Sequence, residues 1–215
     1  MNQAETALLP VLSDEETIGR IISGEKKLYE VIMRRYNQHL YRIAMSILGS
    51  SEEAEDILQA AYLKTYEHLQ EFQFKSGFGT WLTRIVINES LQSLRRTKRS
   101  PEFPAAEDQA ETDKQTPLEN VMNDELRTVL ESSLARLPEK YRLVFVMREV
   151  EEMSISETME CLSLTESNVK VRLNRAKEML RNSLSSHYRS TELYGFHLTR
   201  CDRVVSNVLA RIGCQ

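Results

Sequence analysis

The chain has 215 residues, 41% of them hydrophobic and 28% charged, so we expect one large or two small globular domains rather than a disordered polypeptide. Its few Gly and Pro residues disfavour a loop-rich β-sandwich and favour long helices. No apolar run approaches the roughly 18 residues of a membrane span, and the N-terminal residues lack a secretory pattern, which predicts a cytoplasmic protein.

Within the first hundred residues, apolar residues recur at helical spacing in three stretches. An amphipathic stretch covers about 28–48 and ends at a glycine. Ser50 and the acidic residues after it form a helix-start pattern, which predicts a second helix to about Leu69. A loop over 72–79 then leads to a third helix over about 80–96, which ends in the basic run RRTKR.

The third predicted helix carries polar and aromatic side chains along one face. A helical wheel places on it Trp81, Arg84, Asn88, Gln92 and Arg95. Bases of single-stranded nucleic acid stack on aromatic rings while cations hold the backbone, so the pattern suits such a ligand. Aromatic residues of the preceding loop would pocket an extruded base. On the residue pattern alone, an ordinary core role for the tryptophan stays open.

The net charge of −4 arises in the middle of the chain. Residues 101–125 hold eight acidic side chains, one basic side chain and three of the five prolines. Like charges and prolines predict an extended, self-repelling linker there. The flanking blocks are balanced or slightly basic, so the sequence predicts two modules joined by an acidic tether.

The second module is expected to form helices near 124–136, 139–149, 154–162 and 166–184. Thr165 is a suitable N-cap for the last helix. Two helices joined by so short a turn are typical of a helix–turn–helix, whose second helix enters the major groove of DNA. The core-facing stripe of that second helix holds Val169, Leu173, Ala176, Leu180 and Leu184.

The opposite face of the last helix is polar except for one valine. It holds Ser167, Lys170, Val171, Arg172, Asn174 and Arg175. An exposed valine among polar groups is unusual on a merely solvated face. In a major groove it would contact a thymine methyl group, while the basic and amide groups would reach base edges or phosphates. The alternative is a charged outer helix of a small bundle.

Residues 186–215 carry an apolar helical stripe, which predicts a C-terminal helical extension that docks on another surface. His197 and Cys201 are four residues apart, and Cys214 follows. A structural zinc site needs four ligands, so this set predicts no metal site, and no other cofactor is expected.

Two stretches carry a family resemblance. The stretch EEAEDILQAAYLKTYEHLQEFQFKSGFGTWLTRIVINESLQSLRRTKR resembles the core-binding and −10-element region of bacterial sigma factors of the extracytoplasmic-function group. The stretch ARLPEKYRLVFVMREVEEMSISETMECLSLTESNVKVRLNRAKEML is similar to their −35-binding domain. The resemblance covers about 25–98 and 125–184, in the family's order and with its linker between them.

The resemblance implies a dissociable promoter-specificity subunit of RNA polymerase, without catalytic activity or a small-molecule substrate. Such a subunit binds the β′ and β subunits of the core enzyme, recognises the −10 and −35 promoter elements and assists promoter opening. An inhibitory anti-sigma protein is implied as a further partner. The expected fold is all-α: an N-terminal lead over 1–24, a core-binding and −10 domain over 25–98, a flexible acidic linker over 99–123, a helix–turn–helix −35 domain over 124–184 and a helical extension over 185–215.

Individual site residues follow from the resemblance and the helical faces together. Core polymerase is expected to bind Asp56, Gln59, Leu63 and Lys64, of which Leu63 is an apolar residue on an acidic, exposed face. The −10 element is expected to contact Phe74, Phe78, Trp81, Arg84, Asn88 and Arg95. The −35 element is expected to contact Ser167, Lys170, Val171, Arg172, Asn174 and Arg175.

The second module departs from the family's pattern at three points. Glu157-Thr158-Met159 stands where the family has Glu-Ile-Ala, and Ser163 stands where its turn has glycine. Val171 replaces a small polar residue. These departures predict altered packing and an altered base preference, so the family's promoter sequence is not carried over to this chain.

Two other classes of function compete with this interpretation. A conventional repressor or activator would use the helix–turn–helix on duplex DNA without polymerase, usually as a symmetric dimer. The aromatic and basic module and the acidic linker would be unneeded there. An enzyme is the weakest alternative, because the sequence has no Gly-rich phosphate loop, no paired His–carboxylate motif and no nucleophile signature.

Overall fold

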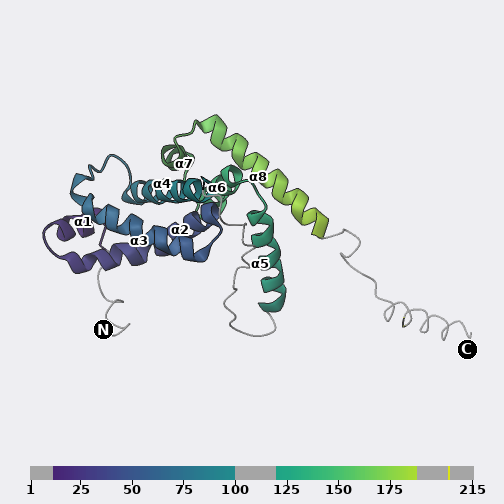
Figure 1. Ribbon diagram of the computed structural model, residues 1–215, viewed down its shortest axis with the longest axis horizontal. Helices are drawn as coiled ribbons and strands as arrows, with labels where there is room; N and C mark the ends of the chain where they lie inside the picture. The colour runs from purple at the N-terminus through teal and green to yellow at the C-terminus, as the bar shows by residue number, and fades with distance from the viewer. Residues whose placement is uncertain (1–11, 100–119, 188–202, 204–215) are drawn as a thin grey trace, which may run out of the picture.

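The computed structural model describes residues 12–99, 120–187 and 203, and the elements within these ranges are all helical (Figure 1). The expected all-α class is therefore confirmed. In chain order the elements are α1 (Asp14–Ile22), η2 (Lys26–Leu28), α2 (Tyr29–Leu48), α3 (Ser51–Glu67), η3 (Leu69–Glu71), α4 (Phe78–Arg99), α5 (Asn120–Ala135), α6 (Glu139–Phe145), η4 (Val146–Val150), α7 (Ile155–Leu162) and α8 (Glu166–His187).

The first module is built on α2, α3 and α4, each of which packs against the other two. Ile32, Leu40 and Leu82 are fully buried between them. The helix ends follow the punctuation of the sequence. Gly49 closes α2 at a left-handed φ of 76°, which glycine adopts without steric cost, and the Ser50 hydroxyl accepts the Glu53 N–H at the start of α3.

Helix α1 lies in the stretch that was expected to be an N-terminal lead, and the sequence analysis did not predict it. Its local signals are nevertheless strong. The Ser13 hydroxyl accepts the Glu16 N–H while the Glu16 carboxylate accepts the Ser13 N–H, which forms a reciprocal capping box. Ile18 and Ile21 are buried against the first module, so α1 is an integral part of that module.

The second module places α8 along α6, with α5 and α7 at its sides. Ala176 and Leu180 of α8 are buried against Leu137, as the predicted stripe requires. Ser163 ends α7 at a φ of 51°, so a serine supports the left-handed turn of the helix–turn–helix where glycine would be unstrained. The stretch expected as one helix over 139–149 divides into the α-helix α6 and the π-helical segment η4.

The two modules pack against each other, which the tether alone did not predict. α7 contacts α4, and α6 and η4 contact α2. A single apolar cluster spans the contact and holds Ile43, Ile47, Ile87, Leu143, Met147, Met153 and Cys161. Figure 1 shows α7 and α6 beside α4, with α8 extending away from the first module.

Within the described part of the chain, no helix is long and apolar enough to cross a membrane. Of the linker expected over 99–123, residues 100–119 lie outside the described residues, while α4 ends at Arg99 and α5 begins at Asn120. The C-terminal residues His197, Cys201 and Cys214 also lie outside the described residues. Among the residues described, no group of three or more His, Cys, Asp or Glu side chains is placed to hold a metal ion.

Candidate nucleic-acid and polymerase-binding surfaces

The predicted polar face of α4 is exposed along its length. We call Trp81, Arg84, Asn88, Gln92 and Arg95 the α4 face; all are solvent-exposed except Trp81, which is half-buried. The Trp81 ring lies 5.0 Å from the Phe72 ring and 5.7 Å from the Phe78 ring, centroid to centroid. The tryptophan therefore belongs to an aromatic cluster and still presents an accessible edge beside exposed polar groups.

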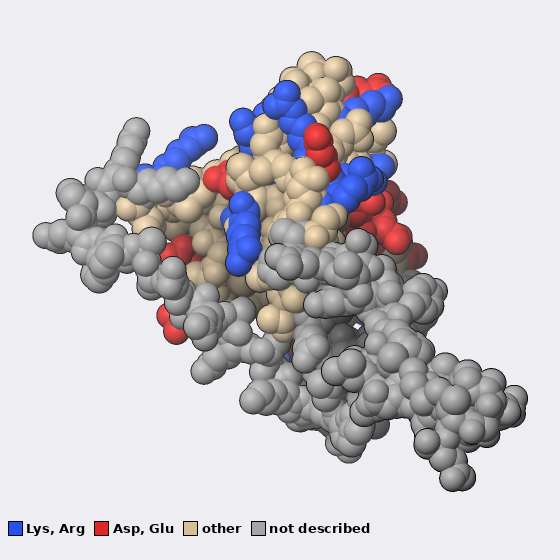
Figure 2. Space-filling view, turned by 90° about the vertical axis from the view of Figure 1, so that its right-hand side faces the viewer, with Lys and Arg blue, Asp and Glu red and all other residues tan. Residues whose placement is uncertain are grey.

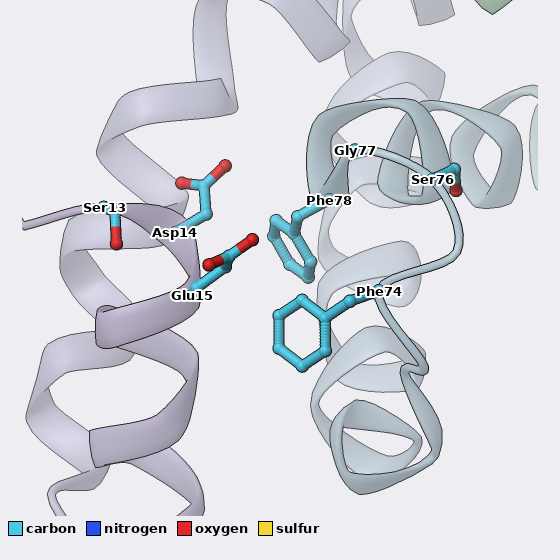
Figure 3. Close-up of a pocket in the computed structure, with 7 residues that line it drawn as sticks. All are labelled: Ser13, Asp14, Glu15, Phe74, Ser76, Gly77 and Phe78. Atoms are coloured by element: carbon cyan, nitrogen blue, oxygen red, sulfur yellow. The ribbon is translucent and has the colours of Figure 1, made fainter.

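The loop before α4 forms an aromatic pocket of about 220 Å³ against α1 (Figure 3). Its lining residues are Ser13, Asp14, Glu15, Phe74, Ser76, Gly77 and Phe78. Phe74 is 49% exposed and has a φ of 52°, which is strained for a non-glycine residue and is typical of functional sites. Phe78 is only 4% exposed, so this predicted DNA contact lies mainly in the core and offers the pocket one wall.

Two carboxylates from α1 line the same pocket, and the sequence analysis missed both. The Asp14 carboxylate accepts hydrogen bonds from Arg35 and from the Tyr36 hydroxyl. Desolvation and this bond raise the pKa of Tyr36. Among the described residues, no hydrogen bond or ion pair engages the Glu15 carboxylate, and Figure 3 shows it directed toward the two phenylalanine rings. No sequence signal links Glu15 to a loop some sixty residues later. Their proximity follows from the packing of α1 against that loop.

A second hollow, of about 290 Å³, lies beside the α4 face. It is lined by Glu71, Phe72, Gln73, Lys75, Ser76, Trp81, Arg84 and Glu160. Seven of these residues come from the first module, and Glu160 comes from α7 of the second. The helix–turn–helix module thus brings an acidic side chain next to the tryptophan and arginine of the α4 face.

Helix α3 presents the predicted mixed face. We call Asp56, Gln59 and Leu63 the α3 face; all three are exposed, and Leu63 is 68% exposed. Lys64 is exposed as well, but its Nζ lies 2.6 Å from the Glu89 carboxylate of α4. The opposite stripe of Leu58, Ala61, Tyr62, Thr65 and Leu69 is buried, as the helical wheel predicted. Single exposed apolar side chains are common on protein surfaces, so Leu63 alone does not mark a binding surface.

Helix α8 exposes the predicted recognition face. We call Ser167, Lys170, Val171, Arg172, Asn174 and Arg175 the α8 face; all are exposed except Arg172, which is half-buried, and Val171 is 47% exposed. The Thr165 hydroxyl accepts the Asn168 N–H and caps the helix as expected. Figure 2 views the molecule from the side where α5 and α8 lie in Figure 1, and shows Lys and Arg side chains spread over that face with some Asp and Glu side chains between them.

Two contacts hold basic groups of the α8 face. Arg175 donates a hydrogen bond to the Tyr141 hydroxyl over 3.2 Å, and this bond lowers the pKa of that phenol. Lys170 forms an exposed ion pair with Glu166 one turn earlier. Both partners lie at the edge of the face, so the guanidinium and ammonium groups are oriented but remain accessible to an anionic ligand.

A helix–turn–helix with a basic recognition face, beside a second helical module with an aromatic and basic face, defines a two-module helical protein of the DNA-binding class. Sequence comparison specifies it further. Residues 32–100 match Sigma-70 region 2, and residues 127–180 match Sigma-70, region 4. The chain is 30% identical over 168 residues to ECF RNA polymerase sigma factor SigM of Mycobacterium tuberculosis, covering 78% of this chain and 83% of that protein.

Other relatives agree. ECF RNA polymerase sigma factor SigW of Bacillus subtilis is 29% identical over 181 residues, covering 79% of this chain and 96% of that protein. The fold resembles CnrH in its complex with the cytosolic domain of CnrY, at a TM-score of 0.61 and 22% identity, covering 81% of this chain and 99% of that one. It also resembles RpoE of Bartonella quintana, solved with the anti-sigma factor NepR. The TM-score there is 0.62 and the sequence identity 18%, covering 73% of this chain and 96% of that one.

The chain belongs to the ECF RNA polymerase sigma factors of the sigma-70 family. Its function is promoter-specific initiation of transcription by RNA polymerase. The resemblance drawn from the sequence is therefore confirmed at the level of family and function. The conventional-repressor alternative loses its basis, because both matched regions are those of a polymerase specificity subunit.

Proposed function

We propose that the chain divides promoter recognition between its two modules. The α4 face and the aromatic pocket would bind the −10 element as a separated strand, and the α8 face would bind the −35 element as duplex. The observation that carries this proposal is the exposure of Arg84, Asn88 and Arg95 beside the half-buried Trp81 and the accessible Phe74. Rings and cations at helical spacing match stacked bases and a phosphate backbone.

The α8 face supports the proposal for the −35 element on different grounds. A major groove distinguishes base pairs by donors, acceptors and the thymine methyl group. Arg175 and Asn174 supply donors and an amide, and Val171 supplies an apolar contact at 47% exposure. The buried stripe on the other side of α8 keeps this face directed outward.

The α3 face is proposed to bind core polymerase. It combines exposed Leu63 with Asp56 and Gln59 on one side of a helix whose other side is buried. The surface is small and mixed, which suits a subunit that binds and leaves rather than a permanent one. Lys64 is proposed to hold α3 against Glu89 at the border of that contact.

The proposed partners follow from these roles of the α4, α8 and α3 faces. The chain would supply specificity and leave nucleotide addition to the core enzyme, so it would act in the cytoplasm without catalytic activity of its own. Two solved neighbours of the same fold are held in complexes, CnrH with the cytosolic domain of CnrY and RpoE with the anti-sigma factor NepR. We propose an anti-sigma protein as a partner of this chain as well.

Strand separation offers a direct test of the α4 face. Holoenzyme carrying Trp81→Ala is expected to start transcription poorly on an intact promoter and to recover on a template whose −10 bases are mismatched. Arg84→Ala should stay defective on both templates, because its proposed contact is with the separated strand. Equal activity of both variants and the wild type on the intact promoter would overturn the proposal for this face.

A further inference from the structure

Three basic side chains of α8 are held by two different kinds of partner. The ammonium groups of Lys170 and Lys177 each form an ion pair with a glutamate, at 2.5 Å and 2.9 Å. Arg175 lies between them in the helix and instead donates a hydrogen bond to the Tyr141 hydroxyl of α6 over 3.2 Å. Among the described residues, no carboxylate forms an ion pair with Arg175. Two cations of this helix are thus paired with an anion, and the third is held by a neutral group.

The two kinds of partner affect a DNA-binding cation differently. A carboxylate offsets the charge of the cation and repels an approaching phosphate or base acceptor. A phenol hydroxyl also accepts the hydrogen bond and fixes the direction of the donor, but it carries no charge at neutral pH. Arg175 is exposed. Its guanidinium is therefore oriented on the α8 face without losing charge to its partner.

The Tyr141 ring is itself held in place by the core of the second module. It is half-buried and packs against the apolar cluster of Leu137, Ala176 and Leu180, where α6 lies against α8 (Figure 1). A tyrosine has only two side-chain torsion angles, so a packed ring leaves its hydroxyl little freedom. Ala176 directly follows Arg175, and the packing of the ring therefore sets the hydroxyl beside the guanidinium.

Positive charge gathers around this phenol. The hydrogen bond from Arg175, together with the charge of Lys140, lowers the pKa of Tyr141. The Lys140 ammonium lies 5.0 Å from the centre of the Tyr141 ring. Glu178 lies within electrostatic range of Arg175, but no ion pair joins the two. An acceptor group of DNA that approached this edge of α8 would meet two cations, neither of them paired with a carboxylate among the described residues.

A fixed direction matters more for reading a base than for contacting a phosphate. A phosphate contact needs charge near the backbone and carries no sequence information. A bidentate contact with guanine needs the guanidinium fork at one position and angle in the major groove. A long arginine side chain loses conformational freedom when it makes such a contact. Tyr141 imposes part of that order when the chain folds, so less freedom remains to be lost when DNA binds.

We propose that Tyr141 is a positioning residue for promoter recognition, which directs Arg175 from α6 toward a base of the −35 element. The proposal rests on the proposed role of the α8 face. It adds to that face a residue of a second helix. Its contribution is discrimination between base pairs at one position, because the hydroxyl fixes the direction of Arg175 and adds no charge.

Tyr141→Phe removes the hydroxyl and keeps the ring in the apolar cluster, so the urea midpoint of unfolding should stay close to that of the wild type. The assay measures binding of holoenzyme to a promoter fragment found by run-off transcription, with its −35 element randomised. Tyr141→Phe should lower discrimination at one base pair by about three- to tenfold, the range expected for one hydrogen bond, and leave the other positions unchanged.

Tyr41→Phe is the matched control. It also removes a phenol hydroxyl that forms a hydrogen bond, here with the Ser51 hydroxyl at 2.8 Å in the first module. Its base distribution across the −35 element should equal that of the wild type. The dependence of binding on salt should also be the same for Tyr141→Phe and the wild type, because the substitution changes no charge.

A double-mutant cycle separates positioning from a direct contact. Arg175→Ala should lose discrimination at the same base pair, and Tyr141→Phe added to Arg175→Ala should change it by less than about twofold further. A Tyr141 hydroxyl that contacted DNA by itself, or that only stabilised α6 against α8, would keep its own effect in the Arg175→Ala chain. An effect of Tyr141→Phe that is equal with and without Arg175 would therefore overturn the proposal.

The remaining outcomes distinguish this proposal from the proposed function. If Arg175→Ala alters base discrimination and Tyr141→Phe does not, the α8 face reads the −35 element and the positioning role of Tyr141 is wrong. If neither variant alters the base distribution, Arg175 does not read the −35 element, and the proposed role of the α8 face fails at this residue together with the positioning.

Discussion

Glu15 directs a carboxylate without a described partner toward the rings of an aromatic pocket, while its neighbour Asp14 is held by Arg35 and Tyr36. A carboxylate only accepts hydrogen bonds, so it favours bases that present amino groups, as cytosine does at N4. If an extruded base enters between Phe74 and Phe78, Glu15 is placed to select its identity.

We therefore expect Glu15→Gln to change base preference at one position of the −10 element. The amide both donates and accepts, so discrimination against a base without an amino group should fall about fivefold, equivalent to about 1 kcal/mol. Transcription from a promoter library randomised across the −10 element measures this. Glu55→Gln, on the exposed side of α3, is the control, and identical base distributions for all three proteins would contradict the role of Glu15.

Arg175 is oriented by Tyr141 and exposed on the α8 face. If it makes a bidentate contact with a base, Arg175→Ala should weaken −35 recognition by about 1–3 kcal/mol and relax specificity at one base pair. Binding of holoenzyme to promoters with single −35 changes measures both effects. Arg181→Ala removes the same charge from another side of α8, and an equal, sequence-independent loss in both variants would show a contact with phosphate only.

Leu63 is the most exposed of the large apolar residues on the described surface, so its truncation removes little packing from the fold. Leu63→Ala should weaken binding to core polymerase by at least about 1 kcal/mol, which is about fivefold, while leaving the melting temperature unchanged. Competition with the wild-type chain for core enzyme measures the affinity. Leu130→Ala, at an exposed leucine of α5, should have no effect, and an unchanged affinity for Leu63→Ala would remove it from the polymerase contact.

At the scale of single elements, the sequence predicted most of what is local. The buried stripe of α3 was assigned correctly because a helix with one buried side imposes its own periodicity. In the predicted α8 stripe Val169, Ala176 and Leu180 are buried, while Leu173 and Leu184 are half-buried. Gly49, Ser50 and Thr165 marked helix ends because their backbone and hydroxyl chemistry acts within a turn. Helix α1 was missed although Ser13 and Glu16 form a capping box, since its nine residues carry too short a pattern.

Helix α7 allows a pH-dependent prediction. The Ser154 backbone N–H donates to the Glu157 carboxylate, and the Ser154 hydroxyl accepts the Glu157 N–H. Hydrogen bonding from the Ser154 side chain and backbone lowers the pKa of Glu157. A lowered pKa contributes stability that is present above the unfolded-state pKa of about 4.3 and is lost as pH falls through the folded-state value. Stability should therefore fall as the pH drops from about 5 through the acidic range below that unfolded-state value.

Glu157→Gln should show a smaller loss of unfolding free energy across that interval than the wild type. Ser154→Ala should in addition lower the unfolding free energy by about 1 kcal/mol near neutral pH, since it removes the N-cap of α7. Urea unfolding at a series of pH values measures both. If Glu157→Gln retains the full wild-type pH dependence, other carboxylates account for the acid sensitivity of the fold.

At the scale of the whole molecule, the sequence predicted two modules and a tether but not their contact. Ile43, Ile87 and Met147 read as parts of separate amphipathic helices, and nothing in their spacing shows that they share one cluster. Glu151 likewise resembles an ordinary charge of an acidic turn until His39 and Arg42 are placed beside it. Contacts between residues about a hundred positions apart are set by tertiary packing, which periodicity does not encode.

The same limit applies to the candidate sites. The α4 and α8 faces were found from helical wheels because each face lies on one helix. The aromatic pocket and the hollow with Glu160 each combine distant segments, so Glu15 and Glu160 could not be found that way. Phe78, predicted as a DNA contact from its loop position, is mostly buried because Tyr36, Phe72 and Trp81 pack around it.

Run-off transcription from genomic fragments of the source organism, with purified core polymerase, tests the central claim that this chain confers promoter specificity. Core enzyme with the chain is predicted to produce discrete transcripts whose start sites are absent with core enzyme alone, and whose upstream sequences share two elements at fixed spacing. If no new start sites appear while the chain alone shifts duplex DNA, it is not acting as a specificity subunit of polymerase, and the account fails.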